Sequence, residues 1–188
     1  MLLSCVPRRI TTLGLAIWIS GAFAGASYAQ FLKPGETAPA PEFRDVTKWI
    51  NSDPLTMAKL RGKVVLLHFW TNGCYNCVNN YHHYKAWHER YADKDVVIVG
   101  VHTPETAGEY DLERIKAQAA KHGLKFSIAV DNDRSNWKAW NNRYWPTVYV
   151  VDRGGRVRYG WEGELNYKGA PGEETVRKLV DSLLLERP

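Results

Sequence analysis

Cysteine is scarce in this chain, which has only three among 188 residues: Cys5, Cys74 and Cys77. A structural zinc site needs a second cysteine pair or a histidine pair at finger spacing, and the sequence has neither. The formal net charge is only +5, and no dense cluster of Lys and Arg accompanies it. We therefore expect neither a bound metal nor a nucleic-acid partner.

A hydrophobic run long enough to span a bilayer is also missing. Residues 1–29 combine a basic start, the apolar stretch ITTLGLAIWISGAFAGA and the small-x-small end Ser27-Tyr28-Ala29. The stretch falls short of about 20 residues, so the pattern indicates a cleaved signal peptide and a periplasmic or otherwise extracytoplasmic protein. The alternative is an anchor formed by the uncleaved segment. Cleavage would lower the net charge from +5 to +3 and would remove Cys5.

The remaining chain has no repeats and no low-complexity tract, and its pattern predicts one α/β domain. We expect an extended leader over residues 30–42 and a single domain over residues 43–188. Short β-branched runs separated by helical spacing indicate parallel crossovers and a mixed sheet flanked by helices. The predicted strands are 63–69, 95–102, 126–130, 147–152 and, after a turn, 156–161; the predicted helices are 74–91, 108–122, 134–142 and 172–186.

The two cysteines of CYNC lie where a predicted strand ends and a predicted helix begins. Unpaired N–H groups and the dipole at a helix N-terminus favour a negative sulfur, so Cys74 is expected to be a nucleophilic thiolate. Cys77 lies one turn further along the helix, within disulfide distance. The pair can therefore open and close without rearrangement of the fold, with Cys74 attacking a partner disulfide and Cys77 resolving the mixed disulfide.

Other interpretations of CYNC are weaker. A disulfide that closes a loop of four residues stabilises a fold by only about 2 kcal/mol in the chain-entropy model. Half a zinc site would need His82 and His83 as partners. Covalent haem attachment fails because Val78 stands where the motif requires histidine.

Several motifs in order resemble a known family. FWTNGCYNC, VIVGVHTPE, VDND and NRYWPTVYVVDRGGRVRYG are similar to the thioredoxin superfamily and, within it, to the secreted thiol-disulfide oxidoreductases of the TlpA, ResA and DipZ kind. DipZ-type domains are the nearest match, over roughly residues 40–186. The resemblance implies a thioredoxin-like fold and an enzyme that exchanges disulfides with protein substrates without a cofactor.

The same resemblance assigns roles to particular residues. It implies Cys74 as nucleophile and Cys77 as resolver. It also implies a cis bond before Pro146, with Trp145, Pro146 and Thr147 forming the surface where a substrate strand docks. We expect Trp70 at the rim of that surface. A membrane thiol-electron transporter is the implied reductant, and we expect a monomer.

The chain departs from the thioredoxin pattern at two positions. Gly73 replaces the tryptophan that often precedes the first cysteine. His68 stands six residues before Cys74, where thioredoxin has a buried acid, and we hypothesise that His68 transfers a proton for Cys77. The pair Tyr75-Asn76 supplies no cation or proline between the cysteines, so we expect a reduction potential on the reducing side of about −180 mV.

Two other functions stay open. Thr71 and Cys74 match part of a peroxidase signature in which threonine positions the attacking cysteine, although Leu67 stands where that signature has proline. A copper-handling module could use the two thiolates and a histidine such as His102.

Overall fold

The computed structural model of the protein describes residues 36–186. The predicted signal peptide and the first part of the predicted leader lie outside the described residues. The elements in chain order are β1 (Ala38–Pro39), β2 (Trp49–Ile50), β3 (Val64–Trp70), α1 (Tyr75–Arg90), β4 (Val96–His102), η2 (Ala107–Glu109), α2 (Leu112–Lys121), β5 (Ser127–Val130), α3 (Ser135–Ala139), β6 (Thr147–Val151), β7 (Arg156–Glu162), η3 (Tyr167–Gly169) and α4 (Gly172–Leu183).

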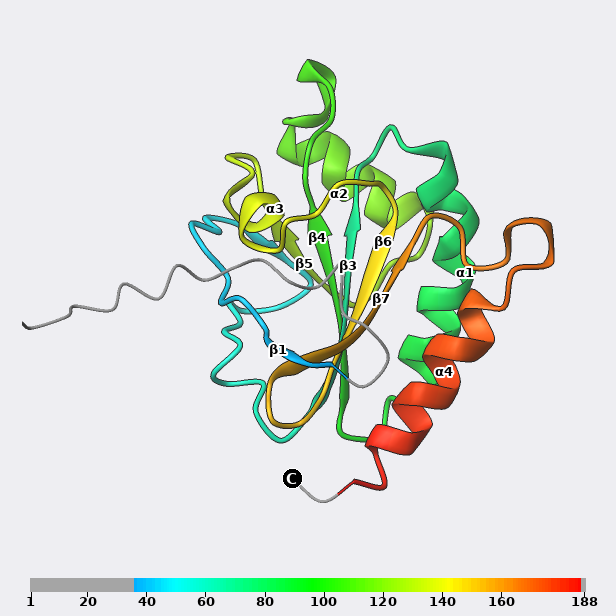
Figure 1. The fold of residues 1–188 in the computed structure, drawn as a ribbon. Helices are drawn as coiled ribbons and strands as arrows, with labels where there is room; N and C mark the ends of the chain where they lie inside the picture. Colours follow the sequence, from blue (N-terminus) through cyan, green and yellow to red (C-terminus); the bar gives the residue numbers. More distant parts are fainter. Residues whose placement is uncertain (1–35, 187–188) are drawn as a thin grey trace, which may run out of the picture.

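The described strands form one seven-stranded sheet in the order β1-β7-β6-β3-β4-β5-β2 (Figure 1). Strands β3, β4 and β5 are parallel, because α1 and α2 carry the chain back between them. Strand β6 runs antiparallel to β3, and β7 runs antiparallel to β6. This arrangement confirms the predicted mixed sheet flanked by helices.

Strand β3 lies at the centre of the sheet, and all seven of its residues are buried. Side chains alternate between the two faces of a strand, so Leu66 and Trp70 lie in one core cluster, and Leu67 and Phe69 lie in the other. Buried residues of α1, α2 and α4 cover the first face. Helix α3 and the segment around Met57 cover the second. Coverage on both faces explains why the run is apolar at every position except His68.

The structure differs from the sequence prediction at the edges of the sheet. Part of the predicted leader forms β1, which pairs with Arg156 and Val157 of β7. Strand β2 was not predicted, and it extends the other edge by pairing with β5. The predicted helix over 108–122 is divided into η2 and α2. Asp111 is the N-cap of α2, because its carboxylate accepts a hydrogen bond from Arg114 N at 3.0 Å. Within residues 36–186, no helix has the length and apolar character to cross a membrane.

Candidate active site

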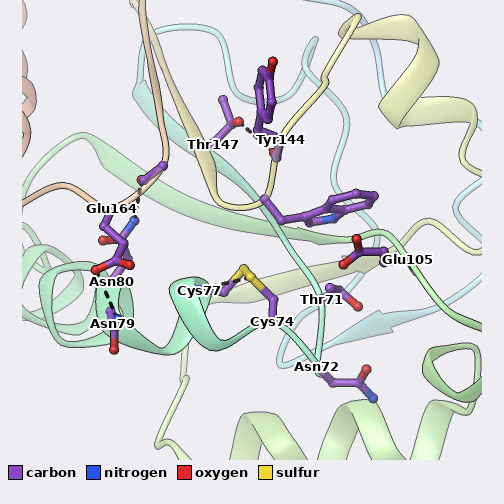
Figure 2. Close-up of a disulfide and its surroundings, with 12 residues drawn as sticks. Thr71, Asn72, Cys74, Cys77, Asn79, Asn80, Glu105, Tyr144, Thr147 and Glu164 are labelled. Carbon is purple, nitrogen blue, oxygen red and sulfur yellow. Dashed lines mark hydrogen bonds between the residues drawn. A yellow bond between two sulfur atoms is a disulfide. The ribbon is translucent and has the colours of Figure 1, made fainter. Parts of the chain in front are cut away.

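The two cysteines lie at the junction between the central strand and the first long helix. Strand β3 ends at Trp70, and α1 begins at Tyr75. Cys74 is therefore the N-cap of α1, and it forms a disulfide with Cys77 across a Cα–Cα distance of 5.2 Å (Figure 2). The junction brings the redox pair to the carboxyl end of β3, as the sequence predicts.

The two sulfurs have different environments. Cys74 is half-buried, whereas Cys77 is completely buried in the core beneath α1. The backbone N–H of Cys77 donates to Cys74 Sγ at 3.1 Å, and the first turn of α1 contains no acidic residue. This donor and the helix end stabilise negative charge on Cys74 when the pair is reduced. The accessible sulfur is thus also the one best placed to become a thiolate.

A groove of about 410 Å³ opens at Cys74. Tyr75 forms one side of it, and Glu105 and Arg143 also line it. A second hollow of about 460 Å³ shares Arg143 and Tyr144 with this groove and extends to Trp161. The half-buried sulfur therefore lies in a groove that has a second hollow as its neighbour.

The predicted docking segment lies beside this groove. The peptide bond between Trp145 and Pro146 is cis. Trp145 stacks on Trp137 with ring centroids 3.9 Å apart, and its indole N–H donates to Thr103 O at 3.1 Å. Thr147 lines the second hollow, where its hydroxyl donates to Tyr144 O at 2.8 Å. Trp145 therefore lines the groove that contains Cys74, and Thr147 lines the neighbouring hollow.

Trp70 does not lie at the rim, and this prediction is wrong. Its side chain is completely buried. It packs edge-on against Tyr81 and His102, with ring centroids 5.8 Å and 5.0 Å away. Because Trp70 is the last residue of β3 on the face covered by α1, the helix hides its indole from any substrate.

His68 lies on the same face of β3, completely buried. Its ring stacks on Tyr84 at a centroid distance of 3.9 Å and meets Phe126 edge-on. Neither ring nitrogen has a hydrogen-bond partner. Burial in this aromatic setting lowers the pKa of His68 to about 3, so the imidazole is neutral at physiological pH.

Sequence analysis missed a polar network behind the loop that leads to Cys74. Thr71 is completely buried, and its hydroxyl donates to Glu109 Oε2 at 2.8 Å. The N–H of Asn72 donates to His102 Nε2 at 3.2 Å. Burial lowers the pKa of His102 to about 4, although Glu109 opposes that shift, so this imidazole is also neutral. Glu109 stands three residues after Thr106, a spacing that indicates only a helix cap, so nothing in the sequence joins it to the cysteines.

The same network bears on the two alternative functions. The Thr71 hydroxyl donates its proton to Glu109 Oε2, so it has no proton to donate to a peroxide at Cys74. His102 Nε2 is occupied by the N–H of Asn72. Within residues 36–186, no group of three or more His, Cys, Asp or Glu side chains is arranged to hold a metal ion.

Asn80 is a second polar residue that the sequence did not single out. Its amide is buried one turn beyond Cys77, where Oδ1 accepts from Leu165 N at 2.9 Å and Nδ2 donates to Gly163 O at 3.1 Å. The N–H of Gly163 in turn donates to Pro146 O at 2.7 Å. Asn80 therefore connects α1 to the docking segment through the loop after β7. Figure 2 shows Asn80 on α1 beside Glu164 of that loop.

Several known proteins are similar to this chain in sequence. The chain is 38% identical to the DipZ proteins of Mycobacterium bovis and Mycobacterium tuberculosis over 145 residues, which cover 76% of this chain and 21% of DipZ. It is 29% identical to the thiol-disulfide oxidoreductase YkuV of Bacillus subtilis, over 79% of this chain and 95% of YkuV. The chain thus spans about a fifth of the length of DipZ, but nearly the whole of YkuV.

Two solved structures are similar to this chain in fold and in sequence. A thioredoxin-like protein in its oxidised form is similar with a TM-score of 0.68 and 30% identity, over 80% of this chain and 97% of the other. A thiol-disulfide isomerase from Corynebacterium glutamicum is similar with a TM-score of 0.69 and 29% identity, over 79% of this chain and 98% of the other.

The fold, the cysteine pair and these relatives define a thioredoxin-like thiol-disulfide oxidoreductase. The chain belongs to the AhpC/TSA family, whose model matches residues 34–160. The predicted fold, the resemblance to DipZ and ResA, and the enzyme class are confirmed.

Proposed function

We propose that this protein is an extracytoplasmic protein disulfide reductase that acts through Cys74 and Cys77. The difference in burial between the two sulfurs is the observation that carries the proposal, because only Cys74 can reach a bulky disulfide. The N-terminal pattern of residues 1–29 supports the location, and the uncharged pair Tyr75-Asn76 supports the reducing direction.

The reaction has two exchanges. The Cys74 thiolate attacks one sulfur of a substrate disulfide, and the other substrate sulfur leaves as a thiolate. Cys77 loses its proton and attacks Cys74 Sγ, which releases the second substrate thiolate and forms the Cys74–Cys77 disulfide. The substrate gains two electrons and two protons, and the enzyme loses them. A membrane thiol-electron transporter would restore the dithiol.

The substrate is a protein segment that docks against Trp145, Pro146 and Thr147. The groove at Cys74 and the neighbouring hollow are open to solvent rather than enclosed, which suits a polypeptide segment better than a small buried ligand. Tyr75 and Tyr144, which line the groove, are 77% and 57% exposed, so aromatic contacts are available to the bound chain.

The test uses Cys77→Ser, which leaves the attacking sulfur without a resolver. We expect this variant to accumulate a mixed disulfide with substrate proteins, whereas Cys74→Ser forms none. Mass spectrometry of the trapped conjugates identifies the substrates. Continued multiple turnover by Cys77→Ser, or consumption of peroxide by that variant, would contradict the proposal.

We also propose that His68 relays a proton for Cys77. Both imidazole nitrogens are unpaired, so the neutral ring has a free acceptor nitrogen. Burial lowers the pKa of His68 to about 3, so the ring can pass a proton on but does not retain it at neutral pH. It stacks against α1, the helix that carries Cys77. His68→Ala is expected to slow disulfide reduction and to change its pH profile. An unchanged rate and profile would show that His68 only fills the core.

A further inference from the structure

Glu109 is a buried carboxylate beside the redox pair. Its side chain comes from η2, a segment distant in sequence from the cysteines, and the residue is only 7% exposed. Oε2 accepts three hydrogen bonds: from Glu105 N at 2.6 Å, Thr106 N at 3.0 Å and the Thr71 hydroxyl at 2.8 Å. Burial raises the pKa of a carboxyl, but these donors outweigh it, so the pKa of Glu109 lies below its usual value. The group carries a negative charge at neutral pH.

The second oxygen of this carboxylate lies against the residue that precedes Cys74. A Cβ atom added to Gly73 would overlap Glu109 Oε1. Consecutive Cα atoms are about 3.8 Å apart, so the charge is on the order of 8 Å from the Cys74 backbone. Glycine at position 73 is thus what permits the close approach.

Other charged groups around Cys74 are few. Arg143 and Glu105 line the groove that contains it, and both are exposed to solvent. The titratable tyrosines Tyr75 and Tyr144 line the same groove. His102, behind the loop, is neutral because burial lowers its pKa to about 4. Solvent screens the exposed charges more strongly than the buried one, so Glu109 is the negative charge with the greatest influence on the loop before Cys74.

We propose that Glu109 is a positioning residue for the redox pair, whose buried charge opposes ionisation of the Cys74 thiol in the reduced protein while its hydrogen bond with Thr71 fixes the turn before Cys74. The charge acts against the N-terminus of α1, which favours the thiolate. A less stable thiolate makes the dithiol a better electron donor. This consequence rests on the proposed reducing function, but the effect on Cys74 acidity does not.

The test measures the pKa of Cys74 in the reduced protein. The rate of Cys74 alkylation by iodoacetamide is followed against pH, with the labelled peptide quantified by mass spectrometry. The Cys74 sulfur lies up to about 3 Å beyond its Cα, so the charge is taken as about 10 Å from the thiol; at that distance a unit charge shifts a pKa by about 0.3 to 1.2 units at dielectric constants of about 80 to 20. We expect Glu109→Gln to lower the Cys74 pKa by an amount in this range. Glu113→Gln is the matched control, because it removes a carboxylate that is 79% exposed on α2, and it should leave the pKa unchanged.

Two further variants separate charge from structure. Thr71→Val removes one hydrogen bond to Glu109 but keeps its charge, so it should leave the Cys74 pKa close to that of the parent protein. Gly73→Ala should lower the Cys74 pKa, because the added methyl group displaces the carboxylate. If Glu109→Gln does not fold, Gly73→Ala tests the effect of the carboxylate in its place. An unchanged pKa in both Glu109→Gln and Gly73→Ala, or an equal shift in Thr71→Val, overturns the proposal. Failure of the trapping experiment with Cys77→Ser would reject the proposed function but would not affect the measured influence of Glu109 on the Cys74 pKa.

Discussion

The connection from α1 to the docking segment through Asn80 gives a quantitative prediction. Asn80→Ala leaves the buried N–H of Leu165 without a partner and also removes the donors to Gly163 O and Tyr84 Oη. An unsatisfied buried group costs about 1–3 kcal/mol, and a more exposed one costs less. We therefore expect Asn80→Ala to lower the free energy of unfolding by about 2–4 kcal/mol.

The neighbouring Asn79 is the matched control. Its amide makes one side-chain hydrogen bond, to Glu164 Oε2 at 3.1 Å, and the residue is half-buried rather than buried. Asn79→Ala should therefore cost less than about 1 kcal/mol. Urea unfolding of the oxidised proteins, followed by tryptophan fluorescence, measures both values.

The same substitution should reduce catalysis. Gly163 N donates to Pro146 O, so a displaced loop no longer holds the docking segment in place. We expect Asn80→Ala to raise KM for a protein disulfide substrate more than it lowers kcat, because the sulfurs themselves are undisturbed. Equal stability losses for Asn79→Ala and Asn80→Ala, with KM unchanged in both, would refute the connection.

Two further predictions concern buried side chains. Burial lowers the pKa of His68 to about 3 and that of His102 to about 4, so below the unfolded-state value of about 6.5 the unfolded chain binds protons that the folded protein does not. The stability that depends on these neutral imidazoles is therefore fully present above about pH 6.5. It is lost as the pH falls from 6.5 toward about 4 for His102 and about 3 for His68, by up to about 1.4 kcal/mol per pH unit for each histidine. Urea unfolding between about pH 6.5 and 4 should show a smaller slope for His68→Phe, and an equal slope contradicts the assignment. Trp70→Ala should lower the free energy of unfolding by about 3–5 kcal/mol because it leaves a cavity, whereas Trp145→Ala should mainly raise KM. Full stability of the Trp70→Ala protein would indicate that Trp70 is exposed at the rim after all.

The central elements could be predicted because their signals are local. The runs that became β3, β4 and β6 are apolar and β-branched, and the segment from 74 to 91 repeats its aromatic residues at helical spacing, so each element indicates its own type. Strands β1 and β2 have two residues each, which is too short for any periodicity. They exist because β7 and β5 offer edges to pair with.

The cysteine pair was predictable for the same reason, and its surroundings were not. Cys74 and Cys77 carry a local motif, whereas Thr71 and Glu109 are 38 residues apart, and Asn80 and Leu165 are 85 apart. Trp70 was misplaced because alternation along β3 identifies the face of the sheet but not the helix that covers it. Only the tertiary arrangement shows that α1 buries the indole beside Tyr81.

The redox equilibrium of Cys74 and Cys77 tests the central claim most directly. The protein is equilibrated in glutathione buffers of graded ratio and, to extend the range to lower potentials, in dithiothreitol buffers of graded ratio. Each sample is quenched with acid and alkylated, and mass spectrometry quantifies the reduced and oxidised protein. We predict a reversible two-electron equilibrium with a midpoint on the reducing side of about −180 mV. A pair that stays oxidised in every buffer, or a reduced pair protected from alkylation by a bound metal ion, would contradict the claim that these two sulfurs exchange disulfides.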